Sequence, residues 1–195
     1  MWANNLLYNI AIDGLPASGK DTLTEILFYS LNHLPETNEK WKVIDSSAMW
    51  RSLSLFLEDY CEKLGITRLS FMETAEKEMV KTIDIEHVRQ ARKDSLNYKK
   101  IVEDIMPNIY IKIDFEENKA TVRYTGLGNQ FDAAYSYIDL KTTDVDVLSG
   151  YIATFNDVRP FVVDMERKTA KSGSCLIPGR DGYSVVLNGV DNTQK

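Results

Sequence analysis

Cysteine and histidine are scarce in this chain of 195 residues, with two of each. Cys61 and Cys175 stand far apart in the sequence, and neither His33 nor His87 has a partner at metal-ligand spacing. The sequence therefore contains neither a zinc-ligand motif nor a disulfide framework. We expect no structural metal site, and we expect both thiols to be buried or incidental, as in a reducing compartment.

Long apolar runs and an excess of basic residues are also lacking. No run approaches the ~20 apolar residues that span a bilayer. The first apolar stretch has no basic segment before it and is interrupted by Asn9 and Asp13, so it does not have the form of a signal peptide. The formal net charge of −6 disfavours a general surface for nucleic acid or anionic lipid, but not a local pocket for one small anion. We expect a cytoplasmic protein that binds neither nucleic acid nor membrane.

Alternating apolar segments predict an α/β fold. Hydrophobic residues form 44% of the chain and charged residues 27%, which is typical of a globular domain. A short apolar run that ends in a turn predicts a buried strand, and apolar residues at helical spacing predict a helix. In order, we expect a strand at 6–12, a helix at 20–34, a strand at 43–44 and a helix at 48–64. This order is typical of a parallel sheet flanked by helices.

The middle of the chain has a different pattern. Residues 68–105 are charged with helical patches, and they are followed by an alternation of Ile109, Ile111 and Ile113 with polar residues. A second strand-like run at 121–124 completes a hairpin signal. We predict an inserted α+β subdomain over 66–143, within a core domain formed by 1–65 and 144–195. In the second part of the core we expect helices near 144–155 and 157–171, a strand at 175–177 and a turn at Pro178-Gly179.

A phosphate-binding loop is predicted where the first strand ends. Gly14-Leu15-Pro16-Ala17-Ser18-Gly19-Lys20 has the spacing of glycine, four residues, glycine and lysine. Such a loop points successive backbone N–H groups at phosphate oxygens, and the following helix adds its N-terminal dipole. Lys20 would reach the β and γ phosphates of a nucleotide. The predicted strand before the loop and the predicted helix after it are the context that this motif requires.

Asp21 is the unusual residue of this loop, and Thr22 follows it. An acid in the first turn of a helix is favourable when it points outward. It is repulsive beside a triphosphate unless it faces a metal ion or solvent. Three interpretations follow: an outward helix acid, a direct or water-mediated role at Mg²⁺, and a site weakened for ATP.

Three arginines lie at the ends of predicted elements. Arg51 follows the strand at 43–44 by one helical turn, Arg180 and Asp181 follow the strand at 175–177, and Arg159 lies near a helix start. Ligands of open α/β sheets bind at the carboxyl ends of the strands, and an arginine fork can hold a phosphate by two hydrogen bonds. With Lys20, these residues predict one positive cleft in an acidic protein.

Five segments in register carry a resemblance to a known family. They are 10–22 (IAIDGLPASGKDT), 44–51 (IDSSAMWR), 141–145 (KTTDV), 155–159 (FNDVR) and 179–188 (GRDGYSVVLN). In order and spacing they are similar to the bacterial-type cytidylate kinases, which are P-loop nucleoside monophosphate kinases. The resemblance extends from about residue 6 to residue 188. It implies a P-loop core, with an inserted domain that binds the monophosphate.

The resemblance also implies roles for single residues. Lys20, Arg51 and Arg180 would be catalytic, with both arginines on the acceptor phosphate. Arg159 would contact the pyrimidine base, Ser46 would line the acceptor pocket, and Asp181 would order the arginines. The donor phosphates of ATP would lie in a loop formed by Gly14, Ala17, Ser18, Gly19, Lys20, Asp21 and Thr22. Mg²⁺ would accompany ATP, near Asp21 or Thr22, and the protein would be a monomer.

The chain departs from the family pattern in several places. Ser47 replaces a glycine, and Trp50 replaces a tyrosine. The base-contacting serine of the family falls on Gly150, with Ser149 one place earlier, so both become candidate substrate residues. The family continues beyond the position of Lys195 with a core strand, an arginine-rich lid and a helix, which we expect to be absent from this chain.

The resulting expectation is ATP-dependent phosphorylation of a pyrimidine nucleoside monophosphate, with CMP or dCMP as the first acceptors and UMP as a further one. Two alternatives remain open. One is a divergent or truncated nucleotide-binding protein with little turnover. The other is a different small-molecule kinase on the P-loop fold.

Overall fold

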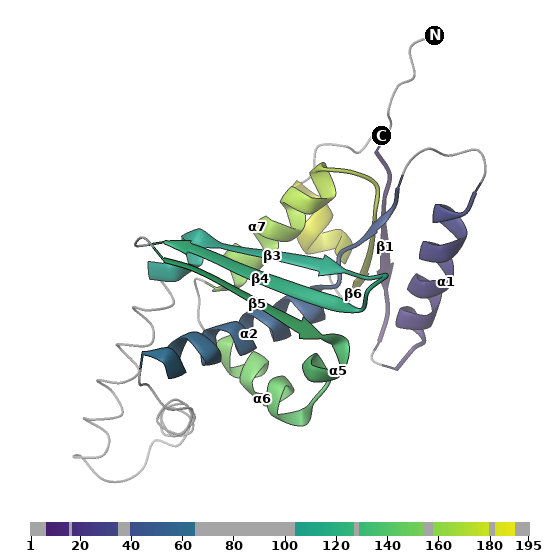
Figure 1. Ribbon diagram of the computed structural model, residues 1–195. Coiled ribbons are helices and arrows are strands. Elements are labelled where there is room, and N and C mark those ends of the chain that lie inside the picture. Colours follow the sequence, from purple (N-terminus) through teal and green to yellow (C-terminus); the bar gives the residue numbers. More distant parts are fainter. Residues whose placement is uncertain are drawn as a thin grey trace.

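A parallel three-stranded sheet forms the centre of the fold. The computed structural model describes residues 7–15, 17–34, 40–64, 104–126, 129–153, 158–179 and 182–189. The strands β1 (Asn9–Asp13), β6 (Cys175–Gly179) and β2 (Lys42–Val43) lie in the order β1-β6-β2, and both pairings are parallel. The strand from the end of the chain therefore lies between the two from its beginning (Figure 1). The predicted α/β class is confirmed.

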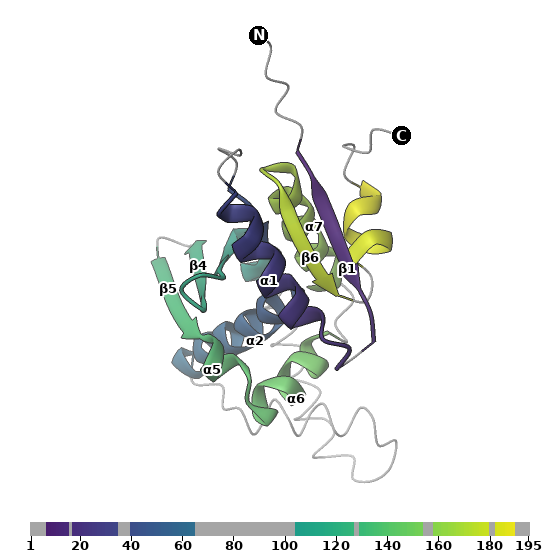
Figure 2. The same cartoon turned by 90° about the vertical axis from the view of Figure 1, so that its right-hand side faces the viewer.

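Helices cover both faces of this sheet. Successive side chains of β6 point to opposite faces of the sheet. Leu176 packs in one hydrophobic cluster, and its neighbours Cys175 and Ile177 pack in another. Leu176 shares its cluster with Phe28 of α1 (Lys20–Asn32). The other two residues share theirs with Val162 of α7 (Val158–Lys171), so α1 and α7 lie on opposite faces (Figure 2).

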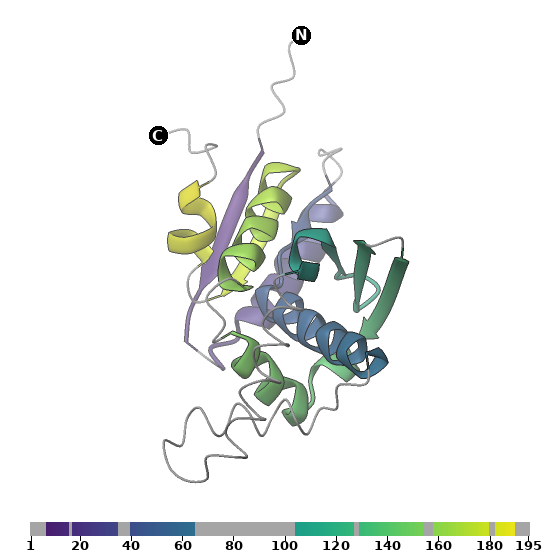
Figure 3. The same ribbon diagram turned by 90° about the vertical axis from the view of Figure 1, so that its left-hand side faces the viewer.

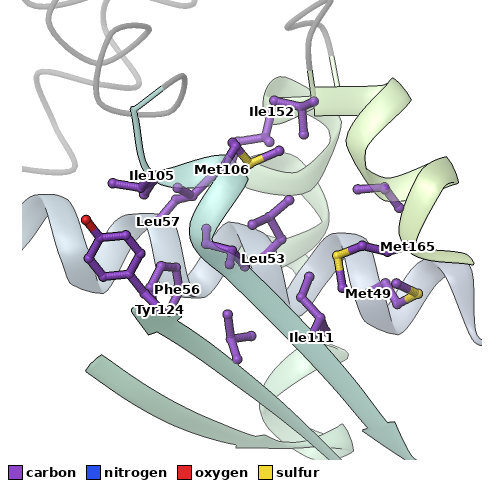
Figure 4. Close-up of a cluster of buried hydrophobic side chains, with 14 of the residues drawn as sticks. Met49, Leu53, Phe56, Leu57, Ile105, Met106, Ile111, Tyr124, Ile152 and Met165 are labelled. Atoms are coloured by element: carbon purple, nitrogen blue, oxygen red, sulfur yellow. The ribbon is translucent and has the colours of Figure 1, made fainter. Parts of the chain in front are cut away.

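The helix α2 (Ser46–Lys63) is the central element of the larger cluster. Its residues Leu53, Phe56 and Leu57 are fully buried. They pack against side chains of α6 (Thr143–Ile152), of α7 and of the second sheet (Figure 4). The deletion of so large a buried side chain typically costs ~2–5 kcal/mol. This one cluster therefore joins the parallel sheet to the second sheet.

The second sheet is antiparallel. It consists of β3 (Ile109–Asp114), β4 (Lys119–Gly126) and β5 (Asn129–Ser136) in the order β3-β4-β5, and it lies along α2 (Figure 3). The predicted hairpin is confirmed as β3 and β4. The sequence analysis missed β5, whose polar residues give little strand signal. A short helical turn (Met106–Asn108) precedes this sheet, and α5 (Tyr137–Leu140) follows it. Most of the predicted helical patches at 68–105 lie outside the described residues, and the boundaries 66–143 stay a prediction.

Several element ends differ from the expectation. Asp45 caps α2 by accepting a hydrogen bond from Ala48 N at 2.9 Å, so the helix begins at Ser46 rather than at Ala48. The predicted turn at Pro178-Gly179 is wrong, because β6 continues through both residues in register with β1. Proline is tolerated there because β2 pairs with β6 only as far as Leu176, so no ladder hydrogen bond is lost on that side.

The last described segment packs beside β1 and α7. It forms two short helical turns, Gly182–Val186 and Leu187–Gly189. Arg167 of α7 donates to the carbonyl oxygens of Val185 at 2.6 Å and Val186 at 3.3 Å. None of the described helices combines the length and apolar character needed to cross a bilayer.

Both cysteines are buried and unbonded to each other, as expected. Burial raises the pKa of the Cys61 thiol to about 12. A thiol with such a pKa is almost entirely protonated near neutral pH, so Cys61 is a packing residue rather than a nucleophile.

Candidate functional site

The loop between β1 and α1 has the backbone geometry of an anion site. Ala17 and Gly19 both have left-handed conformations, with φ of 57° and 80°. Ser18 N donates to Leu15 O at 3.3 Å, which closes the turn between them. Alternation of right- and left-handed residues makes a concave nest of backbone N–H groups. Pro16 is the one loop residue that lies outside the described residues.

The N-terminus of α1 adds to this site. Its N-cap residue is Gly19, and no side chain caps the helix there. The first N–H groups of the helix are therefore available to an anion. Lys20 is the first residue of the helix, and its Nζ donates to Leu15 O across the loop at 2.8 Å. The ammonium group thus lies over the loop, where a phosphate oxygen would replace one carbonyl contact.

Asp21 and Thr22 are exposed in the first turn of α1. This exposure agrees with an outward helix acid, and it also leaves both oxygen-bearing side chains open to solvent beside the loop. The other two interpretations of Asp21 remain open.

Two hydrogen bonds, one on each side of the predicted Arg180-Asp181 pair, connect this part of the chain to the end of β1 and the start of the phosphate loop. Gly14 N donates to Gly179 O at 3.3 Å, and Gly182 N donates to Asp13 Oδ1 at 3.1 Å. Arg180 and Asp181 themselves lie outside the described residues. A Cβ atom at Gly14 would lie 2.8 Å from Ser18 Oγ, so the Ser18 side chain would have to move to make room for it.

The start of α2 contributes a second polar group at the carboxyl edge of the sheet. Ser46 donates its hydroxyl hydrogen to Oε1 of Glu166, which lies on α7. Glu166 is only 2% exposed. Burial raises the pKa of this carboxyl, while the Ser46 hydrogen bond and the charges of Arg159 and Arg167 act in the opposite direction.

Arg51 lies further along α2 and forms an ion pair. Its Nε and Nη2 both lie 2.7 Å from Oδ1 of Asp146, a residue of α6. Ser149 donates its hydroxyl to Asp146 O at 3.0 Å, and the next residue, Gly150, is exposed with open space where a side chain would lie. Arg51 is therefore joined to α6 through Asp146, and Ser149 and Gly150 lie three and four residues further along the same helix.

Arg159 is exposed on the first turn of α7, and its charge acts on Glu166. Glu166 is therefore influenced by both Ser46 and Arg159, and the single positive cleft stays a prediction. Among the described residues, the printed contacts thus join α2 to α7 through Ser46 and Glu166, and α2 to α6 through Arg51 and Asp146. The segment 155–157 before α7 lies outside the described residues.

The sequence analysis missed Glu166 and Asp146. A signal for Glu166 was present, because it follows Val158 and Val162 at helical spacing and so falls on the apolar stripe of α7. An acid on such a stripe has to find a partner. No comparable signal pointed to Asp146, which meets Arg51 from a distant part of the chain.

A cavity of 620 Å³ lies elsewhere, between the two sheets. Aromatic side chains line it, among them Phe28 of α1, Trp41 just before β2 and Tyr110 of β3, together with charged residues such as Lys42 and Asp114. None of the predicted site residues that the structure describes lines it. The candidate site at the carboxyl edge of the sheet is therefore separate from this cavity.

A family model described as cytidylate kinase matches residues 10–191, which is most of the chain. The chain belongs to the cytidylate kinase family. The match includes the phosphate loop, the start of α2 and the end of β6. Among curated proteins, the search finds no match.

Membership of the cytidylate kinase family gives the chain its reaction class. It is a phosphotransferase that phosphorylates a nucleoside monophosphate with ATP. The loop from Gly14 to Lys20, with its nest and its uncapped helix, agrees with a site for the donor phosphates.

Proposed function

We propose that this chain transfers the γ-phosphoryl group of ATP to CMP or dCMP, with UMP as a weaker acceptor. The observation that carries the proposal is the hydrogen bond between Gly14 N and Gly179 O. It joins the phosphate loop to the strand end that precedes Arg180, so donor and acceptor groups would meet at one edge of the sheet. Phosphoryl transfer needs mainly this positioning, together with charge stabilisation.

On the donor side, the loop amides from Ala17 to Thr22 would hold the β and γ phosphates. Lys20 would exchange its contact with Leu15 O for a phosphate oxygen, and its charge would follow the transferred group. Because this charge already lies over the loop, little reorganisation is needed during the reaction.

The residues present fit a magnesium ion that arrives with ATP. Mg²⁺ keeps several waters and usually takes one or two protein oxygens besides the substrate phosphates. Asp21 and Thr22 offer such oxygens, and both are exposed beside the loop. No cluster of three or more acidic, histidine or cysteine ligands occurs in the part of the chain that the structure describes. The ion would neutralise part of the charge on the β and γ phosphates.

On the acceptor side, Arg51 and Arg180 would hold the monophosphate. Arg51 contacts Asp146 through two nitrogen atoms, Nε and Nη2, and the guanidinium group has five N–H donors in total. It therefore retains donors for a phosphate while Asp146 fixes its orientation. Ser46, Ser149, Gly150 and Arg159 would form the wall beside the base, and Asp181 would order the arginines.

The acceptor is tested by steady-state release of ADP from MgATP with CMP, dCMP, UMP, AMP or no acceptor. We expect release that depends on the acceptor, with CMP or dCMP giving the highest kcat/KM. A pyrimidine pocket that recognises polar groups of the base rejects an analogue lacking them because its own groups are left unpaired.

Two other results would contradict the proposal in different ways. Intact ATP binding without acceptor-dependent release supports the nucleotide-binding protein with little turnover. A higher kcat/KM with an acceptor that is not a pyrimidine monophosphate supports a different small-molecule kinase on this fold.

A further inference from the structure

The cavity between the two sheets has no role in the proposed reaction. Its volume of 620 Å³ lies within the ~300–1,000 Å³ that is typical of small-molecule sites. It reaches His33, which follows the last residue of α1, whereas the phosphate loop lies before the first residue of that helix. Because α1 has 13 residues, its two ends lie ~20 Å apart. The cavity therefore offers a place for a ligand that does not occupy the phosphate loop.

Two edge strands contribute walls to this cavity. Among the described residues, β2 pairs only with β6 and β3 only with β4, and residues of both β2 and β3 line the cavity. Lys42 N and Ile44 N donate to Ser174 O at 3.0 Å and Leu176 O at 2.9 Å, both toward β6. Because alternate residues of a parallel strand bond to the same neighbour, the backbone N–H and C=O of Val43 point away from β6.

The contacts of Trp41 show that this outer edge faces the cavity. Trp41 N donates to Asn32 Oδ1 at 2.8 Å, and Asn32 Nδ2 donates to Trp41 O at 3.3 Å. Both Asn32 and Trp41 line the cavity. Val43 lies two residues further along and presents its backbone groups on the same side of the strand. Its N–H is therefore placed to donate to a ligand, as the backbone groups of an edge strand can.

Aromatic side chains lie on the walls that the two strands and α1 contribute. Tyr110 of β3 is 61% exposed, so one side of its ring is open to a ligand. Phe28 and Trp41 add buried aromatic surface. Planar rings pack well against such side chains in offset or edge-to-face arrangements.

The charged residues of the cavity give it a small positive excess in a chain whose net charge is −6. They are three lysines and two acids, namely Lys40, Lys42, Lys112, Asp114 and Glu116. Lys112 and Asp114 pair with each other at 3.3 Å. The Lys42 ammonium group is held against the wall by Ser172, to whose hydroxyl oxygen it donates at 3.0 Å and to whose carbonyl oxygen at 3.4 Å. An ammonium group has three donors, so Lys42 can also donate to a ligand anion.

We infer that this cavity binds a small molecule that combines a planar aromatic ring with an anionic group. The ring would lie against Tyr110, and the anionic group would receive hydrogen bonds from Lys42 Nζ and from the N–H of Val43. This binding site goes beyond the proposed function and does not depend on it.

The test is calorimetric titration of the full chain with naphthalene-2-sulfonate, an aromatic anion. We expect one binding site. Lys42→Met should raise Kd by about fivefold, the upper end for an exposed ion pair. Tyr110→Ala should raise Kd by about tenfold, through the lost ring contact and the lost apolar area. Lys168→Met and Tyr8→Ala are matched controls, because both side chains are exposed and neither lines the cavity.

Two further probes separate the contributions of the ring and the charge. The neutral 2-naphthalenemethanol lacks the anion, and methanesulfonate lacks the ring. We expect both to bind much more weakly than naphthalene-2-sulfonate. Lys20→Met and Arg51→Ala alter the proposed donor and acceptor sites, and both should leave Kd for naphthalene-2-sulfonate unchanged. These measurements need no phosphoryl transfer, so an inactive wild type would contradict the proposed function without affecting this test.

Several results would overturn the inference. The first is the absence of binding at millimolar naphthalene-2-sulfonate. The second is an unchanged Kd in both Lys42→Met and Tyr110→Ala, provided that the melting temperatures show both variants to be folded. A loss of binding in Lys20→Met or Arg51→Ala would place the probe at the reaction edge instead. Equal binding of 2-naphthalenemethanol would contradict the anionic preference, and equal binding of methanesulfonate would contradict the aromatic one.

Discussion

Replacement of Lys20 by methionine is expected to lower kcat by ~10²–10³-fold, the usual cost of removing one preorganised charge from a transition state. The structure gives the reason, because Lys20 Nζ already lies over the phosphate loop in contact with Leu15 O. Methionine keeps the length of the side chain and the helix propensity but not the charge. The measurement is the steady-state rate at saturating MgATP and CMP.

Lys168→Met is a matched control for this substitution. Lys168 lies on an exposed face of α7 and pairs with Asp164 one turn away. Such a surface pair contributes ~0–1 kcal/mol to stability, so the control should keep both its rate and its melting temperature. If the Lys20→Met protein had a rate close to that of the Lys168→Met protein, this result would contradict the proposed role of Lys20 in the donor site.

Replacement of Arg51 by alanine is expected to raise KM for CMP by about 10–100-fold, since a hydrogen bond to a charged group contributes ~1.5–3 kcal/mol. KM for ATP should stay close to its wild-type value, because Arg51 lies on α2 and not in the phosphate loop. Arg51→Lys should recover little, because an ammonium group lacks the planar fork that holds two oxygens. Initial rates at varied CMP and saturating ATP measure both effects.

Asp146 provides the complementary variant. It holds Arg51 at 2.7 Å in this structure, and its own charge would repel a bound monophosphate. Asp146→Asn should therefore lower KM for CMP by a few-fold, within the ~0–1 kcal/mol of a partly exposed pair. A rise in KM with Asp146→Asn, as large as that with Arg51→Ala, would mean that the pair acts as one unit. An unchanged KM in Arg51→Ala would contradict the acceptor role.

The phosphate loop could be predicted because its signals are local. Two glycines, a lysine and the change from an apolar run to helical spacing all lie within 6–34. Backbone conformation then follows from short-range sterics, as the left-handed Gly19 illustrates. The same is true of the hairpin, whose first strand alternates isoleucines with polar residues.

The remaining features depend on contacts between distant parts of the chain. The strand β5 has no β-branched residue, and its pairing with β4 replaces the missing local preference. Likewise, the partners of Arg51 and Ser46 come from α6 and α7, and no periodicity along α2 identifies them. Glu166 could be predicted in part. Its place on an apolar stripe predicts that it is buried, but it does not predict which serine it contacts.

The most direct test of the central claim is identification of the product formed by the 195-residue chain from MgATP and CMP. Phosphorus-31 NMR of one reaction distinguishes CDP, ADP and inorganic phosphate. We expect CDP and ADP to appear in equal amounts, with little inorganic phosphate and almost no product from Lys20→Met protein. Formation of ADP and inorganic phosphate without CDP, or of no product while ATP still binds, would contradict phosphoryl transfer to CMP by this chain.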